Sequence, residues 1–263
     1  MTPSIAAQMA RVQALPDRDA RNEKRDFHRY ELKFRLPIGL IPDLRSAGEP
    51  YLQRDPHAVG REDGVYTVRS IYFDTEDLQF YFEKLDSVKV RKKLRIRSYD
   101  RPEAGPPAFF EIKRKHGRRG YKERLCLRWE QVAPALRGDD EILADRPFLE
   151  RRVLQRFRYN IERKDLRPVV LITYEREPWI GQDDHGLRMT FDQNIRSLYN
   201  PRLDQLFDEE GLNQFEDSHF VLELKFNDRM PTWMAEMMRN FDLKSHSYSK
   251  FTHGIDAWAP HPQ

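Results

Sequence analysis

The chain has 263 residues, a formal net charge of +3 at pH 7, 39% hydrophobic and 34% charged residues. This length suits one domain with its own core, and an aromatic content of 12% argues against a disordered chain. No run approaches the ~20 apolar residues of a membrane span, and no signal peptide is predicted. Cys126 is the only cysteine, which excludes intramolecular disulfides and Cys-clustered zinc sites and favours a reducing cytoplasm.

Alternation of apolar and polar residues is the regular signal along the chain, and it follows a charged N-terminal tail. This pattern predicts eight strands, at about 28–36, 66–74, 88–99, 108–115, 120–128, 168–177, 186–193 and 219–227. Helices are predicted between them at Ile38–Ser46, Trp129–Leu136, Arg146–Lys164 and Pro231–Phe241. Eight strands with interrupting helices predict an α+β domain built on a mainly antiparallel β-barrel or a strongly curled sheet.

Charge is unevenly distributed over these elements. Positions 89–128 hold 15 Lys and Arg against four Asp and Glu, whereas positions 203–242 hold ten acids and three bases. A basic block of this density suggests a polyanionic partner. A solvated face is the simpler interpretation of any single charged run.

The polar face of each predicted strand is almost wholly Arg, Lys and Glu. Because residues i and i+2 share a face, Lys93, Arg95 and Arg97 lie together and oppose Leu94 and Ile96. The same alternation occurs in the other predicted strands. If the charged face is turned inward, a cationic channel results, and its apolar face, including Leu32, Ile96, Ile112 and Leu224, packs outward under the helices.

Three glutamates among these bases indicate the kind of polyanion. Glu31, Glu111 and Glu223 each precede a lysine by two positions. Surfaces built only for nucleic-acid phosphate have little use for Glu, whereas a triphosphate site needs bases for phosphate oxygens and carboxylates for Mg²⁺ or Mn²⁺. No P-loop, dinucleotide-binding, nucleophile-elbow or H-E-x-x-H motif is present.

Nine short motifs occur in an order that resembles the vacuolar transporter chaperone (VTC) domain, the polyphosphate polymerase branch of the triphosphate tunnel metalloenzymes. They are E-L-K-F (31–34), V-R-S-I-Y-F-D-T (68–75), K-L-R-I-R-S-Y (93–99), E-I-K-R-K (111–115), Y-K-E-R (121–124), Y-E-R (174–176), L-R-M-T-F-D (187–192), L-E-L-K-F (222–226) and S-K-F-x-x-G (249–254). The resemblance places a tunnel domain at 28–256 between tails at 1–27 and 257–263, and it suggests a free-standing bacterial type.

The resemblance implies an eight-stranded tunnel barrel that transfers the γ-phosphate of ATP onto polyphosphate and releases ADP. The residues implied as catalytic are Lys33, Arg95, Arg97, Lys113, Arg176 and Glu223. Those implied or predicted to bind phosphate also include Arg69, Lys122, Arg124, Arg188, Lys225, Tyr248, Ser249 and Lys250. Glu223 resembles the ligand of a Mn²⁺ or Mg²⁺ cofactor, with Glu31 and Glu111 as alternatives.

Two other functions fit the same basic face. A tunnel hydrolase would cleave inorganic or nucleoside triphosphate, and a non-catalytic domain would bind polyanions with strong salt dependence. The terminal oxygen of polyphosphate is already anionic near neutral pH, so its attack needs no general base. No base beyond the three glutamates is evident, which favours the polymerase over the hydrolase. The expected partners are ATP and polyphosphate, with no nucleic acid and no membrane segment, in the cytoplasm.

Overall fold

The computed structural model describes residues 29–61, 63–100, 105–117 and 119–258. All eight predicted strands and all four predicted helical regions are present. The strands are β1 (Arg29–Pro37), β2 (Leu52–Arg54), β3 (Tyr66–Asp74), β4 (Val90–Tyr99), β5 (Pro107–His116), β6 (Arg119–Arg128), β7 (Arg167–Gly181), β8 (Arg188–Tyr199), β9 (Asn213–Glu216) and β10 (His219–Asn227). The expected tail 1–27 and residues 259–263 lie outside the described residues.

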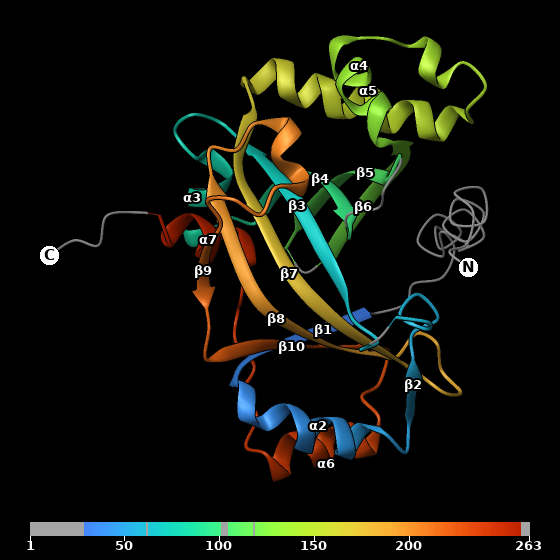
Figure 1. The fold of residues 1–263 in the computed structure, drawn as a ribbon, viewed down its shortest axis with the longest axis vertical. Helices are drawn as coiled ribbons and strands as arrows, with labels where there is room; N and C mark the ends of the chain where they lie inside the picture. Colours follow the sequence, from blue (N-terminus) through green and yellow to red (C-terminus); the bar gives the residue numbers. More distant parts are fainter. Residues whose placement is uncertain (1–28, 62, 101–104, 118, 259–263) are drawn as a thin grey trace, which may run out of the picture.

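Helices occupy the connections between strands (Figure 1). The α-helices are α2 (Ile41–Gly48), α3 (Gln79–Leu85), α4 (Val132–Arg137), α5 (Phe148–Lys164), α6 (Thr232–Asn240) and α7 (Lys250–Asp256). Short 3₁₀ turns are η1 (Ile38–Leu40), η2 (Trp129–Gln131), η3 (Glu141–Leu143) and η4 (Leu203–Phe207). Within the described residues, none of the helices has both the length and the apolar content that a transmembrane helix requires.

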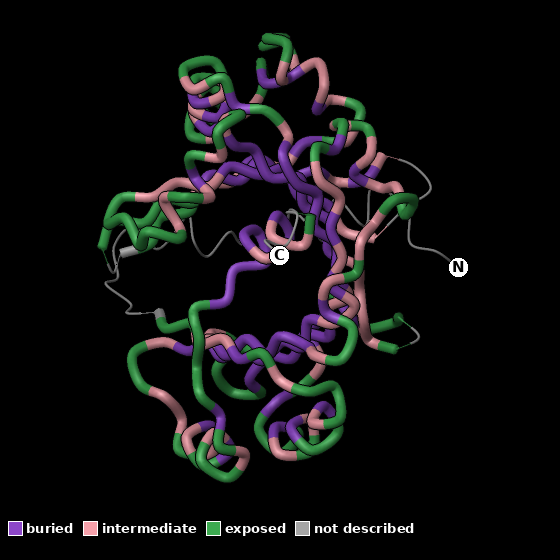
Figure 2. Tube along the Cα trace, turned by 90° about the vertical axis from the view of Figure 1, so that its left-hand side faces the viewer, coloured by how far each residue is buried: buried purple, intermediate pink, exposed green. Residues whose placement is uncertain are grey.

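One antiparallel sheet contains every strand. Its main path runs β1-β10-β8-β7-β3-β4-β5-β6, with β2 paired to β7 and β9 paired to β8. The strands β1 and β6 end this path, and no ladder joins them in the part of the chain that the structure describes. The predicted closed barrel is therefore corrected to an open, strongly curled sheet (Figure 2).

The free edge of β1 explains part of this opening. The backbone N–H of His246 donates to the carbonyl oxygen of Lys33 over 2.9 Å. The segment that leads into α7 thus occupies a backbone acceptor of β1 that a further strand would need. An edge that is partly covered in this way is also protected from pairing with other chains.

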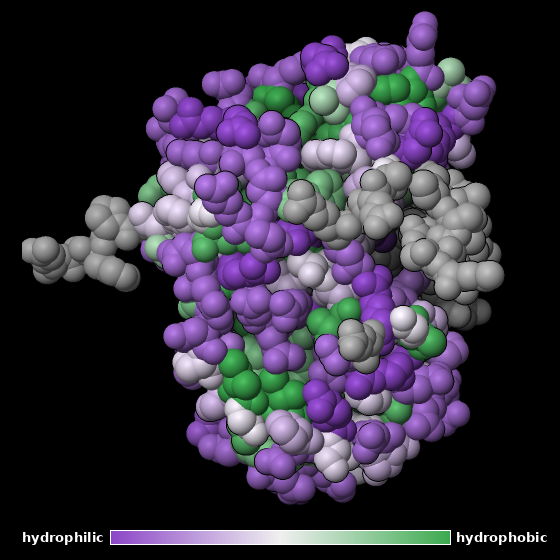
Figure 3. Space-filling view, in the orientation of Figure 1, coloured by the Kyte–Doolittle hydropathy of each residue, from purple (hydrophilic) through white to green (hydrophobic). Residues whose placement is uncertain are grey.

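The outer face of the sheet is mainly apolar and lies under helices, as predicted. Ile96 and Ile112 belong to a core that includes residues of α4 and α5. Leu224 belongs to a second core with residues of α2 and α6, and the partly buried Leu32 packs against it. Figure 1 shows these two helical covers at opposite ends of the molecule. The face drawn in Figure 3 is mainly hydrophilic, in keeping with the high charged content.

Two helices bury an apolar stripe against the sheet. In α5, the residues at i+4 spacing are Leu149, Val153 and Phe157; Val153 and Phe157 are buried, but Leu149 is exposed, so the buried stripe begins one turn after Leu149. In α6, Met234 and Met237 are buried in the second core. The Met and aromatic stripe of this helix is core packing, as expected from the softness of methionine.

The inner, concave face carries a third apolar cluster that holds α7. Phe251 and Ile255 pack with Ile172 and Tyr174 of β7. Figure 2 shows the sheet curling around this C-terminal helix. Because α7 lies on the same face as the charged residues of the strands, it brings Lys250 among them.

Candidate functional site

Strands β4, β5 and β6 align charged side chains on the inner face. Arg95 lies opposite Glu111 and Lys93 opposite Lys113 in the β4–β5 ladder. The β5–β6 ladder sets Lys122 opposite Lys113 and Arg124 opposite Glu111. Residues directly opposite in an antiparallel pair share a face. The register therefore gathers the predicted residues of these three strands.

Arg95 is buried, and a carboxylate neutralises part of its charge. Its Nε donates to Oε2 of Glu111 over 2.6 Å, and its Nη1 donates to the hydroxyl of Tyr72 over 2.8 Å. Lys122 and Arg124 approach the other oxygen of Glu111 at 3.1 and 3.5 Å. Burial would raise the pKa of Glu111, but the surrounding cations, Arg95 first, hold it well below its ordinary value.

Arg97 is equally buried but contacts neutral groups. Its Nε donates to Oγ of Ser70 over 3.0 Å, and its Nη2 donates to the hydroxyl of Tyr174 over 3.3 Å. Among the described residues, Arg97 forms no ion pair within 4.0 Å. Burial would raise the pKa of Tyr72, yet Arg95 and Arg97 outweigh it and lower that pKa. The positive potential of this region thus favours the anionic form of the Tyr72 side chain.

Glu223 of β10 is the centre of a second cluster. Lys225 donates to its Oε2 over 2.8 Å, and Arg176 approaches the same oxygen at 3.3 Å. Lys250 and Lys33 approach Oε1 at 3.4 and 3.5 Å. Burial would raise the pKa of Glu223, but these four cations hold it well below its ordinary value.

Asp192 is a site residue that the sequence reasoning did not single out as a ligand. It is fully buried and accepts from Nε and Nη2 of Arg176 over 2.6 and 2.7 Å. Lys250 donates to it over 2.6 Å. The available signal was its place in L-R-M-T-F-D, on the charged face of a predicted strand. Bidentate pairing fixes the guanidinium plane of Arg176.

Lys93 has only neutral partners in the described part of the chain. Its Nζ donates to Oγ of Ser249 over 2.9 Å and lies 4.7 Å from the ring centroid of Phe251. Burial, followed by repulsion from Lys33 and Lys84, lowers the pKa of Lys93 to about 7. A lysine held partly neutral in this way marks a site with too few anions of its own.

Lys113 shows the same excess of positive charge. Repulsion from Arg95, together with partial loss of hydration inside the concave face, lowers the pKa of Lys113 well below its ordinary value. Its side chain is exposed within the concavity, and no ion pair to it occurs among the described residues. An anionic ligand would relieve this repulsion, which is the electrostatic condition for polyanion binding.

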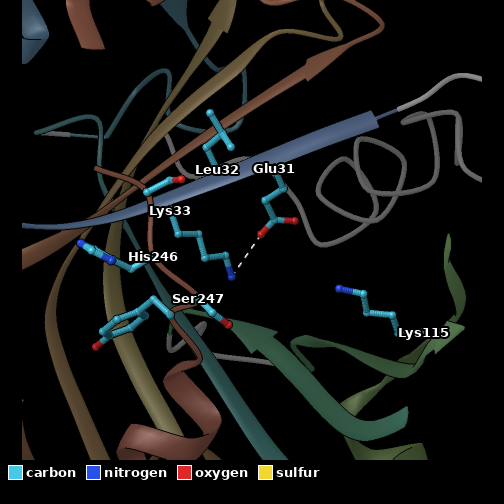
Figure 4. Close-up of a pocket in the computed structure, with 8 residues that line it drawn as sticks. Glu31, Leu32, Lys33, Lys115, His246 and Ser247 are labelled. Atoms are coloured by element: carbon cyan, nitrogen blue, oxygen red, sulfur yellow. Dashed lines mark ion pairs between the residues drawn. The ribbon is translucent and has the colours of Figure 1, made fainter. Parts of the chain in front are cut away.

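A cavity of about 320 Å³ opens between β1 and the segment before α7 (Figure 4). Its lining includes Glu31, Lys33, Lys115 and residues 245–248. Lys33 bridges to Glu31 over 3.1 Å. Burial would raise the pKa of Glu31, but Lys225 and Lys33 outweigh it and lower this pKa to about 2. The cavity is thus a charged opening onto the inner face.

The C-terminal motif divides its residues between two roles. Ser249 caps α7, where its Oγ accepts from the backbone N–H of Thr252 over 3.4 Å, and it also accepts from Lys93. Tyr248 instead donates its hydroxyl hydrogen to Glu216 over 2.9 Å. Burial and the charge of Glu216 raise the pKa of Tyr248. Its hydroxyl is engaged away from the cation cluster.

Two predicted phosphate ligands do not join the inner cluster. Arg69 points to the outer face, because it pairs in register with Ser98 rather than with Arg97, and it contacts Glu209 there. Its predicted place beside the phosphate chain is corrected. Arg188 aligns with Lys225 on the inner face but is exposed at the start of β8.

The carboxylates fit a divalent cation only in part. The described residues contain no group of three His, Cys, Asp or Glu that could hold a metal ion. Glu223 and Asp192 both contact Lys250, whereas Glu111 lies in the other cluster. Mg²⁺ is commonly held by one or two carboxylates with water and substrate phosphates. Glu223 fits such a site when the substrate supplies the other oxygens.

Sequence comparison agrees with this geometry. The profile of the VTC domain family matches residues 28–259. The chain belongs to the VTC domain family. This match covers all the described strands and helices, and it confirms the resemblance noted in the motifs.

Two curated relatives carry the same name. The chain is 26% identical to "Vacuolar transporter chaperone complex subunit 4" of Trypanosoma brucei brucei and 24% identical to that of Schizosaccharomyces pombe. The alignments cover 87% and 74% of this chain but 34% and 32% of the relatives. This VTC domain therefore spans about a third of their length. They are named as subunits of a complex, so the expected free-standing bacterial type is not supported.

A solved structure, that of the PH1819 protein from Pyrococcus horikoshii OT3, superposes with a TM-score of 0.37 at 12% identity. The superposition covers 81% of this chain and 86% of that one.

Proposed function

We propose that this VTC domain is a metal-dependent polyphosphate polymerase, which transfers the γ-phosphate of ATP onto a polyphosphate chain and releases ADP. The observation that carries the proposal is the excess of positive charge on the inner face. Arg97, Lys93 and Lys113 lie there without a carboxylate partner in the described part of the chain. A linear polyanion supplies negative charge to all three of these cations.

Each cluster has a distinct task in this proposal. Arg95 and Arg97 hold phosphate oxygens of the chain, since guanidinium groups make paired contacts to them. Arg176 and Lys250, fixed by Asp192, neutralise charge that develops on the transferring group. The terminal oxygen of polyphosphate attacks the γ-phosphorus, and the bond to the leaving ADP oxygen breaks. That oxygen is already anionic, so no side chain has to remove a proton.

Glu223 would hold Mg²⁺ or Mn²⁺ together with substrate oxygens. A bound divalent ion would supply charge neutralisation at the phosphates. Lys33 and Lys225 contact Glu223 in the ligand-free arrangement. Both lysines are then positioned to bind substrate phosphate in place of Glu223. The proposal keeps the cytoplasmic location expected from the sequence.

The test is incubation of the purified chain with ATP and Mn²⁺ or Mg²⁺, with products resolved by gel and by nucleotide analysis. Long polyphosphate with an equal amount of ADP supports the proposal. Release of orthophosphate without polymer identifies a tunnel hydrolase instead. Salt-sensitive binding of polyphosphate with no turnover identifies a binding domain. Arg202→Met is the matched control, because Arg202 is exposed and pairs only with Asp204 among the described residues.

A further inference from the structure

A row of polar residues crosses the outer face of the sheet, on the side opposite the charged clusters. Arg69 of β3 is paired in register with Thr173 of β7, which is paired with Arg196 of β8. Arg69 is 4% exposed and Thr173 is fully buried. Neighbouring residues of this face, such as Ile71 and Leu171, are apolar core. Two guanidinium groups in such surroundings need anions.

One carboxylate serves both guanidinium groups. Glu209 accepts from Nη2 of Arg69 through Oε1 and from Nη1 of Arg196 over 2.5 Å through Oε2. It belongs to residues 208–212, which connect η4 to β9. Although Arg69 is almost fully buried, the side chain of Glu209 is 45% exposed. The carboxylate that pairs with both arginines therefore belongs to a surface segment.

The site has more donors than Glu209 can satisfy. Arg69 Nη1, Thr173 Oγ1 and Arg196 Nε are buried and have no hydrogen-bond partner in the part of the chain described. Buried polar groups in native proteins are normally paired. All three atoms belong to the one register row, and a carboxylate offers only two oxygens. An anion with four oxygens and two negative charges would match this donor set better.

We propose that Arg69, Thr173 and Arg196 form a second anion site, specific for a phosphate group, which Glu209 fills in the free protein. Binding of phosphate then displaces Glu209 and releases residues 208–212 from the sheet. The site is separated from the inner face by the sheet itself, so it does not depend on the polymerase assignment. It gives the domain a means to sense phosphate apart from the substrate.

Calorimetric titration of the full chain with inorganic orthophosphate tests the site. Removing an internal competitor raises the apparent affinity by the inverse of the fraction of sites that the competitor leaves open, so a competitor that fills nine sites in ten weakens binding about tenfold. We expect Glu209→Gln to bind orthophosphate about tenfold or more tightly than the wild type. The matched control is Glu210→Gln, since Glu210 is the exposed neighbour. Adding Arg196→Met to Glu209→Gln should remove the gain. Orthophosphate that binds on the inner face contributes equally to the titrations of the wild type and of all these variants.

Hydrogen exchange of the wild type provides the structural readout. Orthophosphate, but not sodium chloride of equal ionic strength, should speed exchange at residues 208–212. Titration with AMP distinguishes the source of the phosphate group: a gain in Glu209→Gln for AMP also supports the site and assigns it to phosphomonoesters. Equal orthophosphate affinity in the wild type, Glu209→Gln and Glu210→Gln would overturn the proposal. Unchanged exchange at 208–212 would do the same, and Arg69 and Arg196 would then only anchor this segment.

Discussion

Nζ of Lys93 donates to Oγ of Ser249 over 2.9 Å, which ties the centre of β4 to the residue that caps α7. The contact joins the row of cations to the C-terminal helix that lies on the same face. Because Ser249 is neutral, the bond leaves the charge of Lys93 uncompensated. The seating of α7 and the electrostatics of the inner face are thus linked through one lysine.

The first prediction is a pH dependence of stability that originates at Lys93. Its folded pKa is about 7, below the ordinary 10.5, so between these values the unfolded chain binds a proton that the folded protein lacks. Stability must then rise with pH across this window, by at most ~1.4 kcal/mol per pH unit. Urea denaturation from pH 7 to 10 should show a positive slope in the wild type and a shallower one in Lys93→Met, where Lys113, whose pKa is also lowered, still contributes. Parallel pH profiles for the two proteins would contradict the assignment.

The second prediction separates two adjacent arginines. Arg97→Met removes two hydrogen bonds but no ion pair among the described residues, and it relieves the burial of an unpaired charge, so it should lower the free energy of unfolding less than Arg95→Met does. Arg95→Met takes one partner from buried Glu111 and should cost ~1–3 kcal/mol. Each loss of a charge-assisted contact should weaken tripolyphosphate binding by roughly 10- to 150-fold.

Thermal melting with and without tripolyphosphate checks both arginine variants. A ligand that binds only the folded state raises the melting temperature. This rise should shrink in Arg95→Met and Arg97→Met and stay normal in the exposed-site control Arg202→Met. Equal rises in all four proteins would show that these arginines do not contact the ligand.

Much of the inner face could be predicted because alternation reports which strand face a residue occupies. Arg95 and Glu111 meet, and Glu223 lies on the same face in its own cluster, since antiparallel register preserves the face across neighbouring strands. Arg69 does not lie on this face. It was included because of its motif, although its sequence neighbour Ser70 faces inward and adjacent residues of a strand occupy opposite faces.

Neither the closure of the sheet nor the position of α7 could be predicted from local sequence patterns. Whether β1 meets β6 depends on accumulated curl and on what covers the edge, and here His246 bonds to Lys33. The helix α7 has only seven residues and is held by the inner face rather than by helical periodicity. Lys250 and Asp192 meet only because this helix docks there.

The third prediction concerns Glu223→Gln. Four cations share this carboxylate, so its loss should destabilise the ligand-free protein by ~3–5 kcal/mol. Tripolyphosphate should restore part of that stability, while turnover of ATP should fall to background at limiting Mn²⁺. Glu76→Gln is the matched control, because Glu76 is exposed and pairs only with Arg167 among the described residues. Full activity of Glu223→Gln at limiting Mn²⁺ would exclude it as metal ligand and leave Glu31 and Glu111.

The last prediction uses the packing of α7 on β7. A Cβ at Gly254 would lie 2.1 Å from Cδ1 of Ile172, so Gly254→Ala should cost ~1–3 kcal/mol through overpacking. Since α7 carries Lys250, the melting-temperature rise with tripolyphosphate should shrink as well. Ile172→Val deletes the clashing carbon, and the double variant should regain most of both effects. Gly39→Ala, where nothing lies within 4 Å, should melt like the wild type. If Gly254→Ala responds normally to tripolyphosphate, the docking of α7 does not support ligand binding.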